Sequence, residues 1–173
     1  MSPQRVGILL AGGAGTRLHP VTRAVSKQLL PVYDKPLVYH PLCTLMSAGI
    51  REILVITTPH EAGRFQELLG DGSQWGLRLS YAEQPRPEGI AQALLIAEPL
   101  LARRPATLVL GDNLFFGQGL DQALARASGR EHGATIFACR VEDPARYGVL
   151  AFDATGQPCD ILEKPAQPPS PWA

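Results

Sequence analysis

A glycine-rich segment near the N-terminus combines residue types and spacing that suit phosphate chemistry. Residues 9–18 read LLAGGAGTRL and directly follow an apolar run that predicts a buried strand. Glycines let the backbone approach a phosphate closely, and successive N–H groups then point at its oxygens. Arg17 and Lys27 add positive charge to the same part of the chain. The pattern predicts a phosphate cradle where the first strand ends.

Residue identity excludes two familiar phosphate loops at this position. A Walker A loop ends in Gly-Lys-Ser/Thr, whereas Gly12 is followed by Gly13. A dinucleotide loop needs Gly-x-Gly-x-x-Gly, and Leu18 stands where the third glycine belongs. A tight strand-to-loop turn that binds no ligand is the plain alternative.

Further polar residues follow the ends of other expected strands. Apolar runs alternate with helical patterns, which predicts a mostly parallel sheet covered on both faces. The expected strands are residues 5–11, 52–58, 77–82, 107–110, 134–141, 148–152 and 160–163. The expected helices are residues 36–48, 61–69, 88–101 and 120–127. Open α/β sheets bind ligands beyond the carboxyl ends of their strands, and Gln84 and Asp112 follow two such ends.

Composition excludes several classes of protein. The 173 residues, 45% hydrophobic and 18% charged, suffice for a domain with a buried core and argue against disorder. Zero net charge argues against nucleic-acid binding through bulk charge. The longest apolar stretch, residues 90–102, is too short to span a bilayer, so we expect no membrane contact. Three widely spaced cysteines favour a reducing cytoplasm over a disulfide framework or a zinc site.

Motifs in a fixed order identify a family that this chain resembles, the sugar-phosphate nucleotidyltransferases. They are LAGGAGTRLHP (10–20), SKQLLPVYDKP (26–36), TLMSAGI (44–50), GDNLFFG (111–117), RYGV (146–149) and LEKP (162–165). The second, fourth and fifth of these favour the thymidylyl branch over the uridylyl, adenylyl and guanylyl relatives. The resemblance covers residues 5–165 and implies a three-layer α/β, Rossmann-like nucleotidyltransferase fold with a mostly parallel central sheet.

The resemblance implies transfer of a nucleoside monophosphate. A phosphate oxygen of glucose 1-phosphate would attack the α-phosphorus of dTTP, giving dTDP-glucose and pyrophosphate on the pathway to dTDP-rhamnose. The attacking phosphate is already anionic, so the protein has to position two anions and neutralise their charge. Backbone N–H groups, cationic side chains and Mg²⁺ would do so. A relative that uses UTP or another sugar 1-phosphate is the alternative.

The resemblance also implies roles for residues that match the motifs. Arg17 would hold the β and γ phosphates through its planar donor fork, and Lys27 would add a point charge. Asp112 would bind Mg²⁺, the alternative being a cap on the following helix. The nucleotide would contact Leu10, Gly12, Gly13, Ala14, Gly15, Thr16, Gln84 and Gly89. From the residues alone, Gln84 is equally consistent with a polar turn between prolines.

Two late motifs correspond to the family's sugar-phosphate region, with Tyr147 and Gly148 in the first and Glu163 and Lys164 in the second. Glu163 would accept hydrogen bonds from glucose hydroxyls. Lys164 would bind the sugar's phosphate and act with Arg17, Lys27 and Asp112 in catalysis. Without the resemblance, Glu163 and Lys164 are an exposed charged pair before a proline-rich stretch.

The predicted organisation is one nucleotidyltransferase domain over residues 1–165 and a proline-rich tail over residues 166–173. In the family, chain beyond LEKP supplies more of the sugar pocket, a second metal-binding Asp and much of the oligomer contact. We therefore expect a truncated copy of the enzyme. A nucleotide-binding module without turnover is the alternative function, and the family's homo-oligomer is an open question for this chain.

Overall fold

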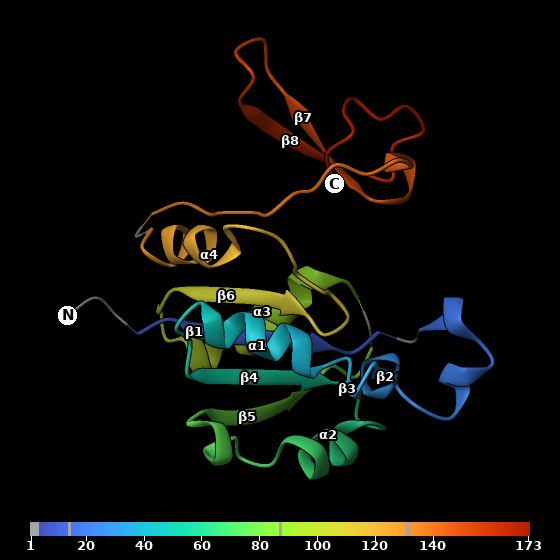
Figure 1. The fold of residues 1–173 in the computed structure, drawn as a ribbon, viewed down its shortest axis with the longest axis vertical. Coiled ribbons are helices and arrows are strands. Elements are labelled where there is room, and N and C mark those ends of the chain that lie inside the picture. Colours follow the sequence, from blue (N-terminus) through green and yellow to red (C-terminus); the bar gives the residue numbers. More distant parts are fainter. Residues whose placement is uncertain (1–3, 14, 87, 131) are drawn as a thin grey trace. The chain divides into compact units, whose positions relative to one another are not determined.

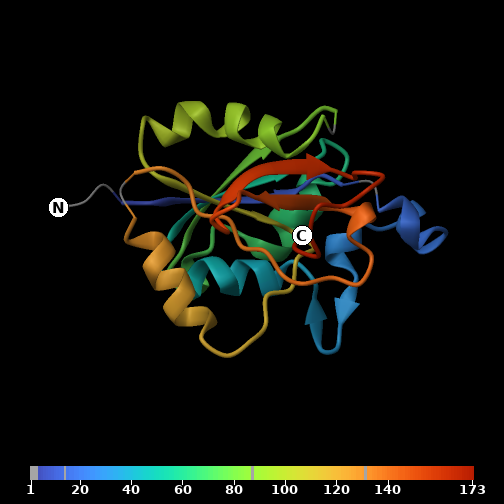
Figure 2. The same ribbon diagram turned by 90° about the horizontal axis from the view of Figure 1, so that it is seen from above.

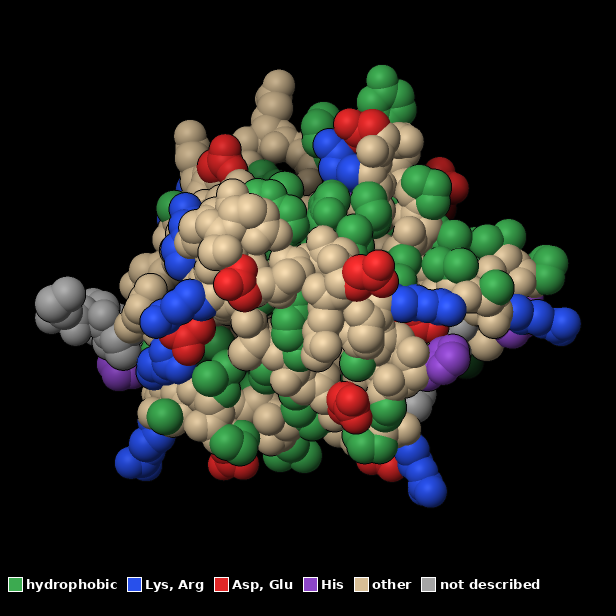
Figure 3. All heavy atoms as spheres, turned by 90° about the horizontal axis from the view of Figure 1, so that it is seen from below, with side chains coloured by type: hydrophobic (Ala, Val, Ile, Leu, Met, Phe, Trp, Pro, Cys, Tyr) green, Lys and Arg blue, Asp and Glu red, His purple; other side chains and the backbone are tan. Residues whose placement is uncertain are grey.

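The computed structural model describes residues 4–13, 15–86, 88–130 and 132–173. The chain divides into two compact units, Met1–Glu131 and His132–Ala173. The first unit holds the central sheet and its helices, and the second holds a two-stranded sheet (Figure 1). Among the described residues, none of the helices is long and apolar enough to cross a membrane. Side chains of both charges are interspersed on the face drawn in Figure 3.

A four-stranded parallel sheet in the order β5-β4-β1-β6 forms the centre of the first unit. Its strands are β1 (Val6–Ala11), β4 (Glu52–Thr57), β5 (Arg78–Glu83) and β6 (Ala106–Leu110). Every residue of β1 is buried, as is all of β4 after its first residue. Such continuous burial is expected of central parallel strands that are covered on both faces.

Helices cover the two faces of this sheet. They are α1 (Tyr39–Ser47), α2 (Ala62–Leu69), α3 (Ile90–Leu101) and α4 (Leu120–Ser128). Figure 2 shows α3 on one side of the sheet and α1 and α4 on the other. Leu42 and Phe65 belong to one buried cluster, whereas Ala93 and Ala97 of α3 belong to a second cluster with Ile8. The predicted three-layer α/β class is confirmed.

The segment between β1 and α1 differs from the prediction. The helix expected over residues 36–48 begins at Tyr39, because Lys35–Pro36 (β3) pairs with Pro31–Val32 (β2) in a short antiparallel ribbon. The backbone N–H groups just before α1 donate hydrogen bonds to residues earlier in the chain. Leu37 N donates to Leu30 O at 2.9 Å, and Val38 N donates to Gln28 O at 2.9 Å. These bonds fix the chain that precedes α1.

The second unit contains an antiparallel pair, β7 (Gly148–Phe152) and β8 (Pro158–Glu163). Asp153 closes the turn between them by accepting hydrogen bonds from the N–H groups of Thr155 and Gln157. A hydrogen bond from the Thr155 hydroxyl lowers the pKa of Asp153 most, and these two N–H bonds lower it further, because all three stabilise its ionised form.

The strand predicted over residues 134–141 is wrong. In the described residues of that segment, the single ladder contact is an isolated bridge between Arg140 and Trp172. Ile136 is 54% exposed, so its apolar pattern does not mark a buried strand. The end of the chain instead bonds back, with Cys139 N donating to Ala173 O at 2.8 Å and Leu150 N to Trp172 O at 2.9 Å. The predicted domain end at residue 165 stays a prediction.

Candidate active site

A cavity of about 220 Å³ lies where β1 and β6 end. The glycine-rich loop, the turn that follows it and the end of β6 all contribute to it. Its lining residues are Gly13, Gly15, Thr16, Arg17, Leu18, Lys27, Gln28 and Asp112. The carboxyl edge of a parallel sheet is where α/β proteins bind ligands, so the cavity is the candidate active site of the first unit.

Gly15 gives the glycine-rich loop its shape. Its φ of 60° lies in the left-handed region, and Thr22 Oγ1 donates to its carbonyl at 2.7 Å. A Cβ added at Gly15 would lie 3.1 Å from Thr22 Cγ2 and 3.2 Å from Lys27 Cβ. A side chain here would therefore push against the base of Lys27. Ala14, also predicted for this loop, lies outside the described residues.

Lys27 and Asp112 meet at this cavity. Lys27 Nζ donates to Asp112 Oδ2 at 2.8 Å, and the two side chains are 33% and 30% exposed. Gly111, which precedes Asp112, packs closely against the end of β1, because a Cβ there would lie 3.1 Å from Ala11 Cβ and 3.1 Å from Gln28 Cγ. Its N–H also donates to Leu10 O at 2.8 Å, which fixes the end of β6 beside the end of β1.

Arg17 is exposed in the short 3₁₀ turn Thr16–Leu18, beside the cavity. Within the part of the chain that the structure describes, its guanidinium has no hydrogen bond or ion pair. Its planar fork of donors therefore remains available to an anion in the cavity.

Gln28 is a cavity residue that the sequence reasoning missed. Its side chain is buried, and its Oε1 accepts from Ser26 Oγ at 2.6 Å. Because the oxygen is engaged, the amide nitrogen lies on the other side, 3.8 Å from where a Cβ of Gly13 would be. Gln28 thus directs a donor toward the loop. Gln28 lies in the motif SKQLLPVYDKP (26–36), which is the sequence signal that could have indicated it.

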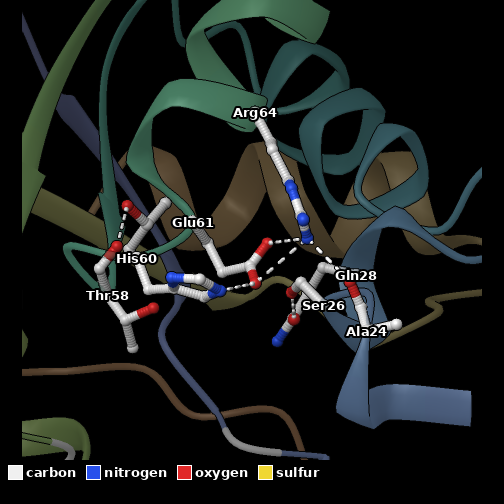
Figure 4. Close-up of polar contacts among 8 residues, drawn as sticks. Ala24, Ser26, Gln28, Thr58, His60, Glu61 and Arg64 are labelled. Carbon is white, nitrogen blue, oxygen red and sulfur yellow. Dashed lines mark hydrogen bonds and ion pairs between the residues drawn. The ribbon is translucent and has the colours of Figure 1, made fainter.

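The segment leading to Ser26 is held from α2 (Figure 4). Arg64 Nη1 donates to the carbonyl of Ala24 at 2.9 Å and pairs with Glu61 Oε2 at 3.3 Å. His60 Nε2 lies 3.9 Å from Glu61 Oε1. No sequence motif pointed to Arg64. The contact joins a helix to the chain that carries Lys27.

The predicted base-binding residues also come together in the first unit. Gln84 follows β5, is 2% exposed and donates its backbone N–H to Thr57 O at 2.7 Å. A Cβ added at Gly12 would lie 2.5 Å from Gln84 Oε1, so a side chain there would force the Gln84 amide to move. Gln84 Nε2 donates to Gly89 O at 3.4 Å. Gly12, Gln84 and Gly89 therefore form one contact group.

The predicted sugar-phosphate residues cluster at one end of the β7–β8 pair. Gly148 lies opposite Glu163 in the register, and Lys164 N donates to Tyr147 O at 2.9 Å. Lys164 Nζ lies 3.2 Å from Glu163 Oε1, with both side chains more than half exposed. An ion pair this exposed contributes little to stability, so both groups remain accessible to a ligand.

A strong charge network in the first unit lies at the opposite edge of the sheet from the cavity. Glu52 begins β4 and accepts from Arg104 Nη2 at 2.8 Å and from Arg78 Nη2 at 2.7 Å. The hydrogen bond from Arg104 lowers the pKa of Glu52; burial opposes it, and the charges of Arg104 and Arg78 lower the pKa further. This network joins β4, β5 and the chain before β6, so its role is structural.

A family model described as nucleotidyl transferase matches residues 6–173. The chain belongs to this family. Three curated relatives, each named glucose-1-phosphate thymidylyltransferase, are 58–60% identical to it. They come from Xanthomonas campestris pv. campestris (59% over 170 residues), Neisseria gonorrhoeae (58% over 167) and Actinoplanes sp. (60% over 167). The family membership predicted from the motifs is confirmed.

The matches cover nearly all of this chain but only part of each relative. The alignments cover 96–98% of this chain but 55–58% of the relatives. The chain thus spans little more than half the length of the curated relatives it matches. A Bacillus anthracis structure titled as a glucose-1-phosphate thymidylyltransferase in complex with sucrose has a TM-score of 0.90 and 34% identity, over 98% of this chain and 68% of that one. A UDP-glucose pyrophosphorylase, 23% identical, shares the fold with a TM-score of 0.77.

Proposed function

We propose that this chain carries the nucleotide-binding part of a glucose-1-phosphate thymidylyltransferase. That enzyme joins dTTP and glucose 1-phosphate into dTDP-glucose and releases pyrophosphate. The observation that carries the proposal is the cavity that unites the glycine-rich loop with Arg17, Lys27 and Asp112. The shared name of relatives at 58–60% identity supports this pair of substrates over UTP or another sugar phosphate.

The triphosphate would lie along the glycine-rich loop. Gly13 and Gly15 border the cavity without side chains in the way, so their backbone can approach phosphate oxygens closely. Arg17 would bind two oxygens through its fork and stabilise the departing pyrophosphate. Lys27, which also lines the cavity, would add a positive charge beside the phosphates. Gln28 would contribute an amide donor aimed at the same loop.

Asp112 fits a magnesium ion that arrives with the nucleotide. Within the described ranges there is no group of three or more His, Cys, Asp or Glu that could hold a metal, and Asp112 offers one carboxylate beside the cavity. Mg²⁺ usually takes one or two carboxylates and completes its shell with phosphate oxygens and water. When bound, the metal would neutralise phosphate charge as the α-phosphorus is attacked.

Recognition of the two substrates would be divided between residues of different segments. Gln84 and Gly89 would contact thymine. Gln84 lies against Gly12 of the glycine-rich loop, and Gly89 accepts a hydrogen bond from Gln84. Tyr147, Gly148 and Glu163 would contact the sugar. Lys164 would bind the phosphate of glucose 1-phosphate and reduce its repulsion with dTTP. We also propose a cytoplasmic location and a role in the dTDP-rhamnose pathway, while the oligomeric state stays an open prediction.

Calorimetry followed by a pyrophosphate-release assay tests the proposal. We expect the chain to bind dTTP in the presence of Mg²⁺, more tightly than it binds UTP. Addition of glucose 1-phosphate should release pyrophosphate, and Arg17→Ala should abolish the release. Binding without release, unaffected by Asp112→Asn, would reduce the function to nucleotide binding. Failure to bind dTTP would overturn the thymidylyl assignment.

A further inference from the structure

Three consecutive hydrogen bonds connect Gln84 to the start of α3. Gln84 Nε2 donates to Gln92 Oε1 at 2.5 Å, and Gln92 Nε2 donates to Glu88 Oε2 at 2.9 Å. The backbone N–H of Glu88 donates to Gln92 Oε1 at 3.2 Å. Gln92 therefore lies between a buried amide on one side and both a carboxylate and a backbone N–H on the other.

The chemistry of Glu88 allows one orientation of the Gln92 amide. An ionised carboxylate only accepts hydrogen bonds and a backbone N–H only donates them. Gln92 must therefore turn its nitrogen to the carboxylate and its oxygen to the N–H group. Rotating the amide by half a turn would place oxygen against oxygen and nitrogen against hydrogen. The polarity of Gln92 is fixed by its own neighbours.

The fixed orientation of the Gln92 amide also determines the orientation of the Gln84 amide. The oxygen of Gln92 requires a donor, so Gln84 must present its nitrogen, and Gly89 O accepts from the same nitrogen at 3.4 Å. Both protons of the Gln84 amide are thus engaged. Gln84 is 2% exposed, so a flipped amide would lose these bonds without gaining water. Its oxygen remains on the side of Gly12, where an added Cβ would lie 2.5 Å away.

We infer that Gln92 is a positioning residue that makes Gln84 a hydrogen-bond acceptor toward the nucleobase; this inference rests on the proposed function. Thymine and uracil carry an N–H at ring position 3, which matches an acceptor. Cytosine carries a lone pair at that position, which an acceptor repels. Gln92, without touching the base, therefore selects against cytosine nucleotides and leaves the choice between thymine and uracil to other residues.

Gln92→Met is the direct test, because methionine keeps the length of the side chain and removes all three of its hydrogen bonds. The unchanged chain should bind dTTP more tightly than dCTP, measured by calorimetry. One lost hydrogen bond is worth roughly a tenfold change, so the dTTP-to-dCTP affinity ratio should fall about tenfold in the variant. Glu88→Ala keeps the backbone donor and should give an intermediate ratio. Gln122→Met, the same change at an exposed position of α4, should leave the ratio unchanged.

A second measurement tests the orientation without any nucleotide. The side-chain amide protons of Gln84 should exchange slowly with solvent in the unchanged chain and faster in Gln92→Met, as followed by NMR. Equal protection in both would overturn the inference, as would an unchanged dTTP-to-dCTP ratio. If the unchanged chain binds no dTTP, the proposed function and the selection against cytosine both fall, while proton exchange still decides whether Gln92 orients Gln84.

Discussion

Lys27 Nζ donates to Asp112 Oδ2 at 2.8 Å across a separation of 85 residues in the chain. The pair unites the segment after the glycine-rich loop with the end of β6, at the cavity where we place the triphosphate. In this contact each group neutralises the charge of the other. A triphosphate and its metal would offer each a stronger partner, so binding should separate the pair.

Replacing Lys27 with methionine should weaken dTTP binding. A hydrogen bond to a charged group contributes about 1.5–3 kcal/mol, so the dissociation constant should rise by one to two orders of magnitude. Lys35→Met is the matched control, because Lys35 pairs with Asp34 outside the cavity lining. Calorimetric titration of both variants with dTTP and Mg²⁺ gives the comparison. Equal affinities in the two would remove Lys27 from the binding site.

Replacing Asp112 with asparagine should uncouple the nucleotide from the metal. In the unchanged chain we expect Mg²⁺ to tighten dTTP binding, because Asp112 would help to hold an ion that neutralises phosphate charge. In Asp112→Asn this gain should largely disappear, while metal-free binding should not weaken, since a negative charge has been removed. Asp121→Asn, at an exposed position of α4, serves as the control. A full magnesium effect in Asp112→Asn would argue that this carboxylate does not bind the metal.

A methyl group at Gly15 should damage both the loop and the site. Gly15→Ala forces a left-handed backbone on alanine, at a cost of about 1–2 kcal/mol. The new Cβ would also press on Thr22 and Lys27. Gly63→Ala makes the same change in α2, where nothing lies within 4 Å, and should be neutral or slightly stabilising. Urea unfolding and dTTP titration of the two variants test this, and similar behaviour of both would contradict it.

The network at Glu52 should make stability depend on pH. Its pKa is lowered in the folded chain from an ordinary value of 4.5, chiefly by the hydrogen bond from Arg104. The stabilisation is therefore complete above that value and is lost as the pH falls through the folded-state pKa. At neutral pH, Glu52→Gln should cost about 1 kcal/mol after allowance for solvent screening.

Urea unfolding at neutral and acid pH measures this effect. The difference between the unchanged chain and Glu52→Gln should shrink as the solution is acidified below the folded-state pKa. Glu67→Gln, at an exposed position of α2, is the control and should show no such trend. A difference that grows on acidification would reverse the predicted sign.

Local patterns sufficed for some features of this molecule and not for others. The buried runs of β1 and β4 are visible as apolar sequence, and the glycine-rich loop is visible as composition. Arg64 and Gln92 were missed because their roles depend on hydrogen bonds to other parts of the chain, which no residue pattern displays. The strand predicted over residues 134–141 shows the converse, since its apolar residues include exposed Ile136.

The pairing of β1 with β6 has a consequence for how the protein is made. Val6 lies opposite Ala106, so the sheet that carries the cavity cannot close until most of the first unit has left the ribosome. Contacts between such distant parts of a chain also form slowly. A nascent chain contains the glycine-rich loop early, but it does not yet contain Asp112 and the end of β6, which complete the lining of the cavity. Capture of a triphosphate by ribosome-bound chains would therefore mark the moment at which β6 joins the sheet.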